Sequence, residues 1–97
     1  MLRHVSVIRW KDGASPAEQS ALLAAIRALP EHVPGIRSYV VAEDAGIDSD
    51  TADFVVIADF DDAEGYRHYR DHPDHAVVKR DLRRLMETRS AVQVEVP

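Results

Sequence analysis

The segment that most constrains the fold is the run from residue 53 to residue 60, which reads Asp-Phe-Val-Val-Ile-Ala-Asp-Phe. Its β-branched and aromatic residues favour a strand, and successive side chains of a strand point to opposite faces of the sheet. Val55 and Ile57 would lie on one face, and the other face would carry Phe54, Val56, Ala58 and Phe60. Both faces of this strand are therefore apolar, so the sheet around it needs a cover on each side.

Three other segments also have strand patterns. Residues 2–10 and residues 36–43 are rich in β-branched and aromatic side chains. Residues 91–96 alternate, with a valine at every second position. These patterns predict three further strands.

A helix is predicted between the first two strands. Ser15 is a helix-capping residue, Pro16 suits the first helical position, and Glu18 completes a capping box with Ser15. The pair Pro34-Gly35 would end this helix. Its predicted apolar stripe consists of Leu22, Ile26, Leu29 and Val33.

A second helical region follows the strand at 53–60 and is interrupted by a proline. Asp61 or Asp62 can cap a short helix over residues 62–70. Pro73 has no backbone N–H and a fixed φ, so this helix cannot continue smoothly past it. A longer helix is expected beyond Pro73, with an apolar stripe of Val78, Leu82, Leu85 and Met86.

The resulting element order is β-α-β-β-α-β in a single domain that covers residues 1–97. Right-handed crossovers would place both helical regions on one face of a four-stranded antiparallel sheet, which is the ferredoxin-like α+β arrangement. The opposite face would then expose apolar side chains from several strands. We therefore expect a homodimer in which the sheet faces opposite the helices pack together.

The composition argues against several classes of protein. The net charge is −5, whereas nucleic-acid binding needs a basic surface. The chain has no cysteine, which excludes disulfides, zinc sites with thiolate ligands and cysteine nucleophiles. No apolar run is long enough to cross a membrane, and no secretory signal is recognisable. We expect a cytoplasmic protein without nucleic-acid or membrane partners.

A cluster of basic residues lies near the predicted end of the second helical region, where positive charges interact favourably with the helix dipole. This interaction accounts for Lys79, Arg80, Arg83, Arg84 and Arg89.

The most distinctive polar segment runs from Tyr69 to His75 and reads Tyr-Arg-Asp-His-Pro-Asp-His. The helix break at Pro73 would let rings from both sides of it converge. His4 is a further imidazole, inside the first predicted strand, although a histidine there is often a hydrogen-bonded core residue. Imidazoles titrate near neutrality and phenols donate hydrogen bonds, so the combination indicates proton transfer or polar recognition.

A metal site is a minor interpretation of the same segment. His68 and His72 have the i,i+4 spacing of a ligand pair, and Asp71 or His75 would supply a third ligand. Pro73 interrupts the helical register, however, and an exposed helix face explains these residues equally well. We expect no metal and no cofactor.

The chain resembles the stress-responsive A/B barrel (Dabb) family over almost its whole length. The resemblance rests on His4-Val5, residues 10–13, residues 34–36, residues 56–60 and, most specifically, the Tyr-x-x-His-Pro-x-His segment at 69–75. It implies a dimeric α+β barrel. Members similar to olivetolic acid cyclase promote the aldol cyclisation of a polyketide, so the resemblance implies a cofactor-independent cyclase or lyase with a hydrophobic small-molecule ligand.

The resemblance also implies site residues. His4 and His75 match two histidines of such a cyclase, and Tyr69 matches a pocket tyrosine, whereas Ile26 stands where the cyclase has a further tyrosine. The substrate is therefore expected to differ. The expected catalytic residues are His4, Tyr69 and His75, with His75 as the general base. The expected substrate-binding residues are Ser6, Ile8, Leu22, Ile26, His72 and Val78.

Two other interpretations remain open, because a fold does not by itself establish an activity. A non-enzymatic, stress-related binding or structural barrel would use its histidines as interior polar residues. A quinol- or haem-handling monooxygenase of related architecture would share the fold but not the segment at 69–75.

Overall fold

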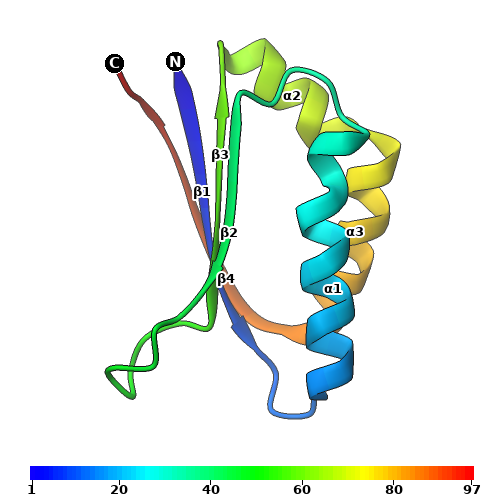
Figure 1. Cartoon of the computed structure of the whole chain (residues 1–97), viewed down its shortest axis with the longest axis vertical. Coiled ribbons are helices and arrows are strands. Elements are labelled where there is room, and N and C mark those ends of the chain that lie inside the picture. Colours follow the sequence, from blue (N-terminus) through cyan, green and yellow to red (C-terminus); the bar gives the residue numbers. More distant parts are fainter.

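The computed structural model describes all residues from 1 to 97 and has the predicted α+β ferredoxin-like architecture. Four strands form one antiparallel sheet in the order β2-β3-β1-β4, and the helices lie against one of its faces (Figure 1). The elements are β1 (Leu2–Trp10), α1 (Pro16–Ala28), the 3₁₀ helix η1 (Leu29–Glu31), β2 (Ser38–Glu43), β3 (Phe54–Phe60), α2 (Ala63–Asp71), α3 (Pro73–Leu85) and β4 (Met86–Glu95).

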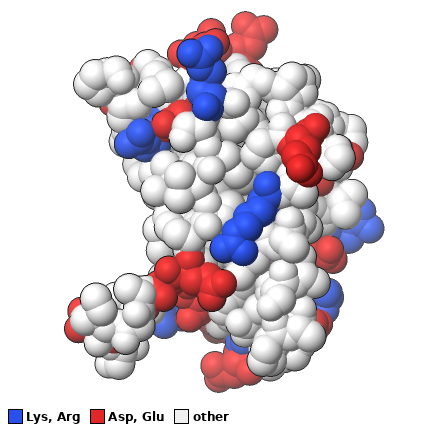
Figure 2. Space-filling model, viewed as in Figure 1, with Lys and Arg blue, Asp and Glu red and all other residues white.

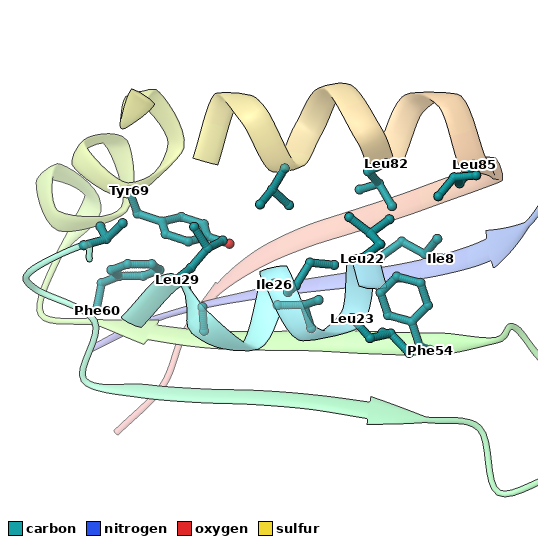
Figure 3. Close-up of a cluster of buried hydrophobic side chains, with 14 residues drawn as sticks. Ile8, Leu22, Leu23, Ile26, Leu29, Phe54, Phe60, Tyr69, Leu82 and Leu85 are labelled. Carbon is teal, nitrogen blue, oxygen red and sulfur yellow. The ribbon is translucent and has the colours of Figure 1, made fainter. Parts of the chain in front are cut away.

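The hydrophobic core lies between the sheet and the helices. Phe54 and Phe60 from β3 pack there with Ile26 from α1 and Leu82 from α3 (Figure 3). Phe60 is fully buried, as expected for the inward face of β3. The alternation along residues 54–60 therefore placed the correct side chains in the core.

The first helix begins as predicted and ends earlier than predicted. The Ser15 side chain accepts a hydrogen bond from the Glu18 amide, and Glu18 accepts one from the Ser15 amide. The predicted continuation to Val33 is wrong, because α1 ends at Ala28 and η1 follows. Pro30 has no N–H to donate to the Ile26 carbonyl, and the Leu29 amide donates to that carbonyl instead.

The break between α2 and α3 lies at the predicted proline. The His72 side chain caps α3, because its Nδ1 accepts a hydrogen bond from the Asp74 amide at 3.1 Å. Asp62 caps α2 by accepting from the Gly65 amide. Both caps satisfy amides that have no partner within their helix.

The start of the last strand differs from the prediction, because β4 begins at Met86 rather than at Ala91. α3 passes directly into β4, and Met86 pairs with Trp10 of β1 after a register shift. The polar residues at the start of β4 concealed the strand, because an edge strand carries little apolar alternation. Arg89 consequently lies opposite Ile8 in the sheet, and its assignment to a helix end was wrong.

The open face of the sheet is apolar. Among its valines, Val40 is 45% exposed and Val92 is 53% exposed. The concave left margin of Figure 2, where this face is seen edge-on, carries few charged side chains. No helix of the chain has the length and apolar character needed to span a bilayer.

Candidate functional site

A cavity of about 290 Å³ lies between the helix-covered face of the sheet and helices α2 and α3. It is large enough for a small organic molecule. Two of the predicted site residues, Leu22 and His72, are not among the residues that line it; Leu22 is in the core and His72 caps α3. The predicted site residues that do line it are His4, Ser6, Ile8, Ile26, Tyr69, His75 and Val78.

His75 is half-buried in the cavity wall in a defined tautomer. Its Nδ1 lies 3.1 Å from the backbone carbonyl oxygen of Arg70, and because a carbonyl oxygen accepts, Nδ1 is the nitrogen that carries the proton. Burial lowers the pKa of His75, with smaller contributions from nearby cations such as Lys79. His75 is therefore neutral at neutral pH, and the lone pair of Nε2 has no hydrogen-bond donor within the protein.

The phenol of Tyr69 lies against this imidazole and points toward the core from α2 (Figure 3). The ring centroids of Tyr69 and His75 are 4.2 Å apart. The Tyr69 hydroxyl is 3.0 Å from the hydroxyl of Tyr39 on β2. Burial raises the pKa of both phenols, so both stay protonated at neutral pH. The pair uses one hydroxyl hydrogen for its mutual bond and keeps the other for a ligand.

His4 is buried, and both of its ring nitrogens are engaged. Nδ1 is 2.7 Å from the side-chain nitrogen of Gln93, and Nε2 is 3.1 Å from Ser6 Oγ. With the Gln93 amide donating to Nδ1, Nε2 carries the proton and donates to Ser6. Burial, then the charge of Arg89, then His75 lower the pKa of His4 to about 4. His4 is therefore a neutral, fixed side chain at neutral pH and not a free proton acceptor.

Ser6 connects this histidine to a cation. Its Oγ also accepts a hydrogen bond from Nη2 of Arg89 at 3.0 Å. With His4 and Arg89 both donating to Oγ, the Ser6 hydroxyl hydrogen remains free for an acceptor in the cavity. The row of Arg89, Ser6, His4 and Gln93 forms a continuous polar network along β1 and β4.

Several cavity or network residues were not identified from the sequence. Tyr66 lies three residues before Tyr69 on the same helix, and its ring centroid is 4.9 Å from that of His4, so helical spacing could have indicated it. Tyr39, Arg89 and Gln93 reach this site from strands that are distant in sequence. Finding them requires the strand order and the start of β4, which no local pattern supplies.

The histidines of the alternative metal site lie near each other on the outer side of the helix break. The ring centroids of His68 and His72 are 5.8 Å apart. No group of three His, Asp or Glu side chains is placed to hold a metal ion. These histidines are separate from the cavity.

The family model described as the stress responsive A/B barrel domain matches residues 2–96 of this chain. A similar solved structure is that of a dimeric ferredoxin-like protein of unknown function from Thermobifida fusca, which is 33% identical with a TM-score of 0.91. That comparison covers 98% of this chain and 90% of the other. A Dabb family protein from Mesorhizobium loti is 24% identical with a TM-score of 0.80, covering 99% of this chain and 95% of the other.

A more distant structural neighbour is a hydroxynitrile lyase from Passiflora edulis, which is 14% identical with a TM-score of 0.88, covering 99% of this chain and 93% of the other. A structural match at such low sequence identity shows a common fold and says nothing about activity. No protein of curated function matches the chain in sequence. Because the family model spans nearly every residue and the fold agrees with it, the chain belongs to the stress responsive A/B barrel domain family.

Proposed function

We propose that the cavity binds a small, carbonyl-containing molecule and transfers protons on it without a cofactor, as a cyclase or lyase does. The observation that carries this proposal is the state of His75. Its Nδ1–H is held by the Arg70 carbonyl, its Nε2 lone pair is unused, and its lowered pKa keeps it neutral. A neutral imidazole beside a phenol is suited to general-base catalysis.

In the proposed reaction, His75 Nε2 removes a proton from the carbon next to a substrate carbonyl. The electron pair of that C–H bond moves to the carbonyl oxygen, and the resulting enolate accepts a hydrogen bond from the phenol of Tyr69. The enolate carbon then attacks a second carbonyl of the same molecule and forms a C–C bond. The new alkoxide takes the proton back from His75, so the imidazole is neutral again.

His4 has a positioning role in this scheme. Its two ring nitrogens are held by Gln93 and Ser6, so it fixes the orientation of the Ser6 hydroxyl next to the cavity. Its pKa of about 4 is too low for effective proton abstraction at neutral pH. The proposal therefore assigns the base to His75 alone.

The fold is compatible with this chemistry, because a hydroxynitrile lyase shares it. That similarity is a fold-level analogy and does not indicate the same substrate. The specific support comes from His75, Tyr69 and the cavity that they line.

We also propose that the protein is a homodimer formed through the open face of the sheet. Val5 and Val7 of β1 lie on this face, and the neighbouring strands add Val40, Val55, Ile57, Val92 and Val94. A contiguous apolar face of this kind favours association. Structural neighbours from Thermobifida fusca and Bacteroides fragilis are described as dimeric.

The second candidate function is a non-enzymatic binding barrel. It is favoured by the His4 network, because every polar atom of a buried histidine is satisfied there as in an ordinary core residue. In that case the cavity would bind ligand without turning it over. Measured proton exchange on a bound ketone separates the two functions.

The test is the exchange of the methyl protons of acetophenone in D₂O, followed by NMR. Wild-type protein should accelerate the exchange, and His75→Ala should reduce the acceleration by about a hundredfold or more. His32→Ala, which changes an exposed histidine that does not line the cavity, is the matched control and should behave as wild type. Binding without any acceleration would favour the non-enzymatic barrel.

A further inference from the structure

The residues that line the cavity include an unusual set of charges. Four are basic, namely Arg70, Lys79, Arg83 and Arg89, and none is Asp or Glu. The chain as a whole carries a net charge of −5. The cavity therefore concentrates positive charge against the overall balance of the protein, which favours an anionic occupant.

Most of these cations lack an acidic partner. Arg70 makes two hydrogen bonds to Asp71, so its charge is already balanced. Lys79, Arg83 and Arg89 have no carboxylate within 4.0 Å, whereas the adjacent Arg84 is paired with Glu18 on α1. All three of these cations line the cavity, so no carboxylate of the chain neutralises their charge there.

Two of these cations are held in place by hydrogen bonds to other residues of the cavity lining. Arg89 donates to Ser6 Oγ at 3.0 Å, and Lys79 donates to the Arg70 carbonyl at 3.1 Å. That carbonyl also holds His75, so Lys79 and His75 are adjacent. Arg89 lines the same cavity as His75 and Tyr69. It also shares the Ser6 hydroxyl with His4.

We propose that the ligand of this cavity is a carboxylate with an apolar body, and that Arg89 and Lys79 bind its carboxylate group. The body would lie against Ile8, Ile26, Val78 and Leu82, which line the same cavity. A guanidinium and a carboxylate are matched in shape and form strong, charge-assisted hydrogen bonds. This inference rests on the proposed function, because it names the class of molecule that the same site takes.

The volume of the cavity favours a small organic acid. About 290 Å³ is enough for an aromatic or short-chain acid. Inorganic phosphate could satisfy the same two cations without filling the apolar part. It therefore serves as a comparison in the test.

The test compares salicylate with methyl salicylate, its neutral ester, by isothermal titration calorimetry at neutral pH. Salicylate should bind about tenfold more tightly than the ester and should lose this advantage at high salt concentration. Inorganic phosphate should compete weakly with salicylate and not at all with the ester. Equal affinities for the acid and the ester would overturn the inference.

Variants identify the groups responsible. Arg89→Gln and Lys79→Gln should each reduce salicylate affinity toward that of the ester and leave ester affinity unchanged, and Arg89→Lys should retain part of the preference. Arg80→Gln removes an exposed charge from α3, the helix that carries Lys79, and should not change the affinity for salicylate. If Arg89→Gln weakened both ligands equally, Arg89 would be a structural residue and the inference would be wrong.

The outcomes also separate this inference from the proposed function. Suppose that methyl salicylate binds, that its binding depends on His75, and that salicylate binds no more tightly than the ester. This result would leave the proton-transfer site intact and contradict the anion site. Binding of neither compound, with acceleration of acetophenone exchange absent as well, would contradict both.

Discussion

At the scale of single residues, the two cavity histidines have different environments and therefore different roles. His4 has both nitrogens occupied and a pKa of about 4, whereas His75 has one nitrogen held by a carbonyl and the other free. The family resemblance implied that both would belong to one site, but not that their states would differ. The difference arises from Ser6, two residues along β1 on the same face, and from Gln93, which lies opposite His4 in the register of β1 and β4.

The buried state of His4 predicts a loss of stability in acid. Its pKa is about 4 in the folded protein and 6.5 in an ordinary environment, so the unfolded chain takes up the proton first as the pH falls. The contribution of the neutral His4 side chain to the free energy of unfolding is fully present above about pH 6.5. It is lost progressively toward about pH 4, and the total loss is about 3 kcal/mol. His75 adds a loss in the same direction, because its pKa is also lowered.

Urea unfolding at neutral and acidic pH measures this effect. His4→Gln keeps a polar, hydrogen-bonding side chain and should remove most of the loss assigned to His4. His32→Gln should retain the pH dependence of the wild type. An unchanged acid sensitivity in His4→Gln would show that His4 does not carry this coupling.

At the scale of helices and strands, the junction between α2 and α3 positions the site. Pro73 separates the helices, and His72 caps the second one, so that Tyr69 and His75 from the two sides of the break face each other at 4.2 Å between ring centroids. The sequence predicted this break because proline acts locally.

His72 is therefore expected to affect folding more than binding. His72→Ala should lower the free energy of unfolding by about 1 kcal/mol, because the Asp74 amide loses its acceptor. Salicylate affinity should stay unchanged, since His72 does not line the cavity. His72→Asn supplies another capping acceptor and should recover the stability. A loss of ligand affinity at unchanged stability would instead make His72 a binding residue.

The strands show where prediction from sequence failed. β3 is apolar on both faces, because one face packs against the helices and the other belongs to the open face of the sheet. The predicted strand at 53–60 therefore nearly matches the observed bounds, Phe54–Phe60. β4 is an edge strand whose first residues are polar, so nothing local distinguished them from a helix end. Arg89 was missed for that reason. Gln93 lies in the predicted part of the strand, but its contact with His4 depends on the pairing of β1 with β4, and the contact of Tyr39 with Tyr69 depends on packing between β2 and α2.

At the scale of the whole molecule, the sheet separates two apolar environments. The helices cover one face of the sheet (Figure 1) and enclose the core and the cavity with it. The other face carries the valines that we propose as a dimer interface. Both uses follow from the double apolar alternation of residues 54–60. Structural neighbours from Thermobifida fusca and Bacteroides fragilis are described as dimeric.

The dimer interface can be tested with one charge. Val7→Lys places a cation on the open face of β1, where an interface would desolvate it, and should convert the dimer to a monomer. Val77→Lys makes the same change on α3, where Val77 is 52% exposed, and should leave the dimer intact. Multi-angle light scattering after gel filtration gives the mass of each. A wild-type protein with the mass of one chain would contradict the interface.

The central claim is that His75 accepts a proton from a molecule bound in the cavity. The most direct measurement is the rate of acetophenone deuteration per bound site, with occupancy determined in the same sample for wild type and His75→Ala. The account predicts a rate that rises with pH through the lowered pKa of His75 and falls by about a hundredfold in the variant. Equal rates for the two proteins at equal occupancy would contradict it.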